Sequence, residues 1–198
     1  MRTNLIASFA FVVVPSVAFL AISAACGGGN ANNGGTTPSA GPHDDYAQPA
    51  ATAPASDKVT WKKDPALAKC HNDVKTGADL QAGVTAMANG CAALTKMKQV
   101  GAPVAGSRGP LDKPQVIPLH AEANHCYRVY GLSEDALKDL DVAMTDSAGK
   151  VCAEDGSDSP DSVVLEDGSV CFKVADDVSV NVAAGDGSGN FVVEIWGD

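Results

Sequence analysis

The cysteines are the residues of this 198-residue chain that offer the most chemistry. Cys70 and Cys91 lie on the apolar stripes of two predicted helices. Pairing them would close a loop of about 20 residues, which stabilises a fold by about 3 kcal/mol in the chain-entropy model. We therefore expect a Cys70–Cys91 disulfide. The total of six cysteines indicates an oxidising compartment without the density of a disulfide miniprotein.

Three aspartates form a candidate calcium site. Asp139 and Asp141 share one face of a predicted strand, and Asp146 lies in the turn that follows it. Carboxylates grouped with loop carbonyls suit a cation that prefers oxygen ligands. The spacing does not match an EF-hand loop, and acidic residues are also ordinary residues of turns. Calcium binding and plain turn chemistry are therefore both open interpretations of these residues.

The sequence lacks the motifs of catalysis. Its four histidines are scattered, and it contains neither a His-Glu-x-x-His nor a Cys-x-x-Cys motif. The run Gly-Asp-Gly-Ser-Gly at 185–189 lacks the Gly-x-Ser-x-Gly spacing of a serine hydrolase, and we interpret it as a hairpin loop. We predict no catalytic residue, no enzyme activity and no cofactor other than the calcium considered above.

Two aromatic residues are candidates for binding at the surface. Tyr130 and Trp196 occupy outward positions of predicted strands, and a sugar-binding surface would use exposed aromatic rings. Ordinary packing is the competing interpretation. The formal net charge of −10 argues against a nucleic-acid partner, because nucleic-acid binding rests on Lys and Arg side chains that neutralise phosphates.

The N-terminus predicts where the protein resides. Arg2 is followed by an apolar segment, residues 5–22, and then by Ser-Ala-Ala before Cys26. A charged start, an apolar middle and small residues before a cleavage site are typical of a secretory signal, and the cysteine makes this one resemble a bacterial lipobox. We therefore expect a lipoprotein signal peptide at 1–25 and lipidation of Cys26. An ordinary signal peptide and an uncleaved anchor are the alternatives.

Two further regions precede the β-rich part. Residues 26–56 are rich in Gly, Asn, Ala, Thr and Pro, which predicts a disordered tether behind the lipid. Region 57–114 is predicted to be a helical hairpin. Its first helix begins at Asp64-Pro65. Its second helix has apolar residues at spacings of 4, 3, 4 and 3, starting from Leu80, and ends at Gly101.

The C-terminal region, 115–198, changes to a period of two. Apolar residues alternate with polar ones in several short runs, of which Val-Ser-Val-Asn-Val at 178–182 is the clearest, and turn residues separate the runs. About eight short strands without intervening helices indicate an antiparallel sandwich. The predicted fold class is mainly β with a small α part: an antiparallel β-sandwich of about eight strands preceded by a disulfide-linked helical hairpin.

The same region resembles a known module. The runs HCYRVYGLSEDALKDLDVAMTDSAGKVCAEDGSDS, VCFKVADDVSVNV and GSGNFVVEIW are similar to the pre-peptidase C-terminal (PPC) sandwich modules that are frequent in lipoproteins of the myxobacterial type. The matching features are a Cys-Tyr-x-Val strand, an Asp-Leu-Asp strand, a second cysteine in a late strand and an aromatic residue closing the last strand. The resemblance implies a jelly-roll or PPC-like fold and an accessory, non-catalytic role.

The resemblance also implies a second disulfide. In such modules the first-strand and late-strand cysteines occur together, which corresponds to Cys126 and Cys171 here. A Cys152–Cys171 bond with Cys126 free is the alternative. Cys152 is otherwise left over, either as a buried thiol behaving as a small apolar residue or as a reactive or intermolecular thiol.

These features predict a non-catalytic, lipid-anchored protein of the cell envelope that displays or binds something. Its anchor would hold it on the outer membrane, on the periplasmic side or at the cell surface. An envelope protein or an extracellular polymer is the expected partner. The alternative is an accessory or inhibitory subunit of an envelope hydrolase or protease.

Overall fold

The computed structural model describes residues 55–72 and 79–198. The expected signal peptide, the lipidation of Cys26 and the first 29 residues of the expected tether, 26–54, lie outside the described residues and stay predictions. The described residues include the last two of the expected tether, Ala55 and Ser56. Ser56 is buried, and its hydroxyl donates a hydrogen bond to Asp146 Oδ2 at 2.8 Å.

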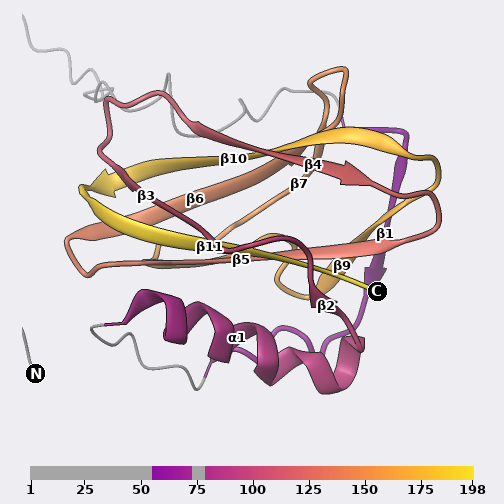
Figure 1. Cartoon of the computed structure of the whole chain (residues 1–198), viewed down its shortest axis with the longest axis horizontal. Coiled ribbons are helices and arrows are strands. Elements are labelled where there is room, and N and C mark those ends of the chain that lie inside the picture. The colour runs from indigo at the N-terminus through magenta and orange to yellow at the C-terminus, as the bar shows by residue number, and fades with distance from the viewer. Residues whose placement is uncertain (1–54, 73–78) are drawn as a thin grey trace, which may run out of the picture. The chain divides into compact units, whose positions relative to one another are not determined.

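Two sheets make up most of the described chain, and every pairing between their strands is antiparallel (Figure 1). The seven-stranded sheet contains β1 (Val59–Lys63), β2 (Lys98–Gln99), β3 (Val104–Arg108), β5 (Cys126–Ser133), β8 (Asp161–Val163), β9 (Gly168–Phe172) and β11 (Gly189–Gly197). The four-stranded sheet has the order β4 (Gln115–Ala121), β10 (Asp176–Gly187), β6 (Leu137–Thr145) and β7 (Val151–Glu154).

The main core lies between the two sheets. Alternation along the strands places one apolar set on the inner face of each sheet, as the period of two requires. Strand β10 contributes Val178, Val180 and Val182, whereas β11 contributes Phe191 and Val193. The structure therefore confirms the predicted antiparallel β-sandwich.

One helix, α1 (Leu80–Thr95), covers the outer face of the seven-stranded sheet (Figure 1). It begins after Asp79, whose carboxylate accepts a hydrogen bond from the Ala82 amide at 3.0 Å. Its C-cap is Lys96, which adopts the left-handed conformation with a φ of 60°. A second apolar cluster joins the helix to β5 and β11, with Val84, Met87, Cys91, Leu132 and Val192 among its members.

The predicted helical hairpin is only half present in the described residues. The second predicted helix is α1, but it ends at Thr95 rather than at Gly101, because the chain enters β2 at Lys98. The first predicted helix is instead a series of turns over residues 65–72. The Asp64 carboxylate accepts a hydrogen bond from the Ala66 amide at 2.9 Å, as the predicted start signal requires, but turns follow it as far as residue 72.

The predicted boundary near residue 115 does not separate two domains. Strand β1 pairs with β9, and both β2 and β3 pair with β11, so region 57–114 supplies three strands to the sandwich. Eight strands from β4 onward match the predicted strand region. The run 185–189 is not a hairpin loop, since β10 and β11 belong to different sheets and the chain crosses between them there.

Candidate functional site

Both expected disulfides are present. Cys126 and Cys171 are register partners on β5 and β9, and they are bonded to each other. The alternative Cys152–Cys171 pairing is therefore wrong. Cys70 and Cys91, which are 21 positions apart in the sequence, are also bonded, and this bond fixes the turn segment 65–72 against α1.

Cys152 is a free and fully buried cysteine on β7. Its side chain belongs to the core between the two sheets. Burial raises the pKa of its thiol to about 11, so the thiolate that would react is strongly disfavoured. The geometry supports the interpretation of a small apolar core residue over that of a reactive thiol.

The prediction that Tyr130 and Trp196 form an exposed binding surface is wrong. Both side chains are on the outward face of the seven-stranded sheet, but α1 covers that face and leaves them 1% and 8% exposed. Alternation along β5 and β11 distinguishes the two faces of the sheet. It does not show that a helix covers the outer one.

A buried polar network accompanies these aromatic side chains beneath α1. Arg128 is fully buried, and its Nε donates to the Tyr130 hydroxyl at 2.8 Å while its other nitrogens donate to the carbonyls of Gly168 and Glu166. The guanidinium therefore has backbone and hydroxyl acceptors in place of a carboxylate. Buried donors that are satisfied in this way hold the elements around them in one arrangement.

Glu194 is the buried carboxylate of the same face, with 1% of its surface exposed. It accepts hydrogen bonds from Thr85 Oγ1 at 2.6 Å and Gln81 Nε2 at 3.0 Å, both on α1, and from Trp196 Nε1 at 2.9 Å. These contacts join the helix to β11. The network therefore holds α1 against the sheet.

The calcium prediction combined residues that the structure keeps apart. Asp146 follows β6, so about 16 Å of extended strand separates it from Asp141. Its carboxylate is already occupied, because it accepts from the Ser56 hydroxyl and from the amides of Ala148 and Lys150 at 2.8–2.9 Å. Asp146 therefore acts as a turn residue, as the competing interpretation expected.

Asp139 and Asp141 do lie together, on the outer face of the four-stranded sheet. A Cβ atom at Gly185 would collide with the Asp139 carboxylate and lie 2.9 Å from Asp141 Oδ2, so both carboxylates lie over the same glycine. Burial, with the charges of Asp139 and Asp155 next, raises the pKa of Asp141 to about 7. Burial also raises the pKa of Asp155 to about 6.

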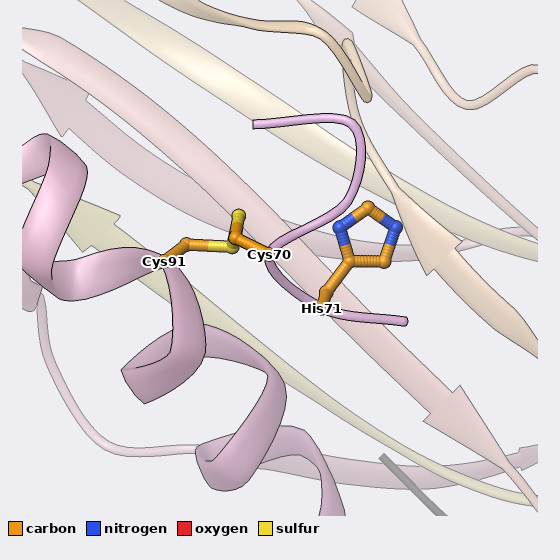
Figure 2. A group of neighbouring side chains, drawn as sticks. All are labelled: Cys70, His71 and Cys91. Carbon is orange, nitrogen blue, oxygen red and sulfur yellow. A yellow bond between two sulfur atoms is a disulfide. The ribbon is translucent and has the colours of Figure 1, made fainter. Parts of the chain in front are cut away.

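A different group has the geometry of a metal site. Among the described residues, Cys70, His71 and Cys91 are the one group of three whose potential ligand atoms all lie within 4.8 Å of one another (Figure 2). In the structure the two sulfur atoms are bonded as a disulfide. The sequence interpretation counted His71 among scattered histidines. His71 is adjacent to Cys70 in the sequence, and the predicted Cys70–Cys91 disulfide already placed Cys91 nearby, so the sequence contained the signal for this group.

Trp61 is an exposed aromatic residue that was not among the predicted binding residues. It lies on β1 with 53% of its surface exposed, and its Nε1 donates to the Cys152 carbonyl at 2.9 Å, which fixes the ring. A shallow pocket of about 350 Å³ surrounds it, lined also by Ala55, Ser56, Val59, Thr60 and Lys63. Because residues two positions apart lie on the same face of a strand, Trp61 would be expected on the buried face with Val59. The sequence pattern therefore predicted a buried Trp61 side chain.

Comparisons with known proteins add no relative. No family model matches the chain, and no curated protein matches it. The resemblance to PPC-like modules therefore stays a prediction. In the described part of the chain, no helix combines the length and the hydropathy that crossing a membrane requires.

Proposed function

We propose that this chain is a non-catalytic, lipid-anchored protein of the cell envelope that displays a disulfide-bonded β-sandwich for binding. Cys26 carries the lipid in this proposal, and residues behind it tether the sandwich. The PPC-like character of the sandwich belongs to the same proposal. The partner is an envelope protein or an extracellular polymer.

The observation that carries the proposal is the pair of disulfides within one fold, Cys70–Cys91 and Cys126–Cys171. Disulfides form and persist in oxidising compartments such as the bacterial periplasm and cell surface, and they are rare in the cytosol. They therefore support export, which the N-terminal pattern predicts independently. Export with a cysteine at the cleavage site favours a lipid anchor over a freely secreted protein.

The anchor is tested by replacing one residue. In bacterial cells that process lipoproteins, the full chain should fractionate with membranes and carry acyl groups on an N-terminal Cys26. Cys26→Ser should abolish the modification and shift the protein to the soluble fraction or leave it with an uncleaved signal. Mass spectrometry of the N-terminal peptide distinguishes these cases. An unmodified Cys26 in the mature protein would refute the anchor.

Binding is tested at Trp61, the largest exposed apolar side chain on the described part of the chain. Crosslinking on intact membranes followed by capture of the full chain should recover a partner, and Trp61→Ala should reduce the yield. Leu111→Ala is the matched control, because Leu111 is 79% exposed and does not line the pocket. Equal recovery with Trp61→Ala would place the binding surface elsewhere. Recovery of a hydrolase or protease would favour the accessory-subunit alternative.

A further inference from the structure

His71 places a third potential metal ligand beside the Cys70–Cys91 disulfide. We propose that, once this disulfide is reduced, the two thiolates and the Nδ1 atom of His71 bind one zinc ion. The disulfide and the zinc-bound form would then be alternative states of the same three side chains. Neither the motif analysis nor the proposed envelope function assigns a metal to these residues.

The first support is the imidazole itself. His71 is 5% exposed, and its Nδ1 atom is buried without a hydrogen-bond partner. Buried polar atoms are nearly always paired, so an unpaired one requires an explanation. Figure 2 shows the ring beside the disulfide, with one nitrogen on the side of the sulfur atoms and the other on the far side. A ring nitrogen beside two sulfur atoms can serve as a third metal ligand in the tautomer that leaves its lone pair free.

The second support is the partner of the other ring nitrogen. Nε2 of His71 lies 3.7 Å from Glu166 Oε1, which is ion-pair distance and slightly longer than a hydrogen bond. Histidines that bind metals usually present their second nitrogen to a carboxylate, which fixes the tautomer and makes the ligating nitrogen a better donor. A proton on Nε2 would leave the lone pair on Nδ1. Glu166 would therefore be a positioning residue for the ligand and would not itself touch the metal.

The donor set and its spacing select the ion. Zinc binds thiolate sulfur at about 2.3 Å and imidazole nitrogen at about 2.0–2.1 Å in a tetrahedron, which places neighbouring ligand atoms about 3.5–3.8 Å apart. The three ligand atoms lie within 4.8 Å of one another here, so separation of the sulfur atoms on reduction is the main movement required. Soft sulfur ligands select zinc over calcium or magnesium. Two cysteines and one histidine leave the fourth position open.

The change of state balances in two steps. A dithiol reductant transfers two electrons and two protons to the disulfide, which breaks the sulfur–sulfur bond, forms the thiols of Cys70 and Cys91, and leaves the reductant as a disulfide. Zinc then replaces the two thiol protons, which are released to solvent, while neutral His71 donates its lone pair. Oxidation reverses the sequence and expels the ion.

The test uses the full-length chain with Cys26→Ser, purified in mild detergent, so that the N-terminal thiol does not contribute. After anaerobic reduction, titration with zinc alone should load one ion per chain, whereas the oxidised chain should load none at this site. Cys70→Ser/Cys91→Ser should abolish loading, and His71→Ala should weaken it by about 100-fold because it removes a direct ligand. Glu166→Gln should weaken it by about tenfold through the orientation of His71.

Cys126→Ser/Cys171→Ser is the matched control. It removes the same number of thiols and the other disulfide, yet it should bind zinc like the reduced parent. Circular dichroism decides the case in which reduction unfolds the chain, because zinc should then restore the β signal only where Cys70, His71 and Cys91 are intact. The proposal is overturned if the reduced parent binds zinc no better than Cys70→Ser/Cys91→Ser, or if His71→Ala leaves the affinity unchanged.

Discussion

Replacing Asp141 by Asn should stabilise the protein at pH 8 and leave its stability nearly unchanged at pH 4. Burial and then the charges of Asp139 and Asp155 raise the pKa of this carboxyl from its ordinary value of 3.8 to about 7. The unfolded chain releases the proton near the ordinary value. Between about pH 4 and pH 7 the folded state therefore binds more protons, and the free energy of unfolding falls as the pH rises through that window.

The size of the effect follows from the shift. A gap of about three pKa units corresponds to about 4 kcal/mol at 1.36 kcal/mol per unit. The Asp141 side chain is only half-buried, and solvent screens a charge in that position, so about 1–2 kcal/mol is the expected penalty above pH 7. An amide does not ionise, and Asp141→Asn should recover that free energy at pH 8.

Urea unfolding at pH 4, 6 and 8 measures this difference. Asp135→Asn is the matched control, since it removes one carboxylate that is exposed just before β6 and should give no pH-dependent gain. A variant Asp141→Asn that is no more stable than the parent at pH 8, or that gains equally at pH 4, would contradict the reasoning. Added calcium at pH 8 tests the predicted metal ligands Asp139 and Asp141. Calcium should raise the urea midpoint of the parent and not that of Asp141→Asn if these residues bind it. A midpoint of the parent that calcium leaves unchanged would exclude calcium binding there.

One labelling experiment and three substitutions test how the buried residues are packed. The thiol of Cys152, whose pKa is raised to about 11 by burial, should resist Ellman's reagent in folded Cys26→Ser chain and react once urea unfolds it; labelling of the folded chain would contradict the burial. Gly90→Ala should lower the free energy of unfolding by about 1–2 kcal/mol despite the helix propensity of alanine, because the new methyl would collide with a backbone carbonyl of the segment that carries the disulfide. Gly156→Ala, in open space, should be neutral in the same unfolding assay. Tyr130→Phe should cost about 1–2 kcal/mol in that assay because it removes a hydroxyl acceptor from a fully buried guanidinium, and it should leave partner capture unchanged.

Strong periodicity was sufficient to predict the elements with one buried face. The apolar steps from Leu80 onward define α1 because that helix needs a single continuous stripe. The alternation in 178–182 defines β10 because only its inner face meets the core. The disulfide Cys70–Cys91 was also predicted, although only Cys91 lies on a helical stripe and Cys70 lies in the turn segment 65–72.

Elements stabilised by their neighbours were not predictable from their own residues. Strand β1 is short, and its four residues after Val59 are exposed in succession despite the apolar Trp61, so its pairing with β9 and not a buried face makes it a strand. Strand β2 has two residues, too few for any pattern. Asp64 does start the segment that follows it. The conformation of the turns after it, however, depends on a close approach between the Cys70 carbonyl and Gly90 of α1.

The buried outer face of the seven-stranded sheet was predictable only by combining two patterns. Strand alternation placed Arg128 and Glu194 outward, and their charge favoured solvent over burial. The stripe of α1, however, needs an apolar surface of its own, and the outward residues Leu132 and Val192 provide one. An amphipathic helix beside a sheet with apolar residues on both faces therefore predicts a third layer. Charged residues between those apolar ones must then find partners beneath the helix, as Glu194 does with three donors.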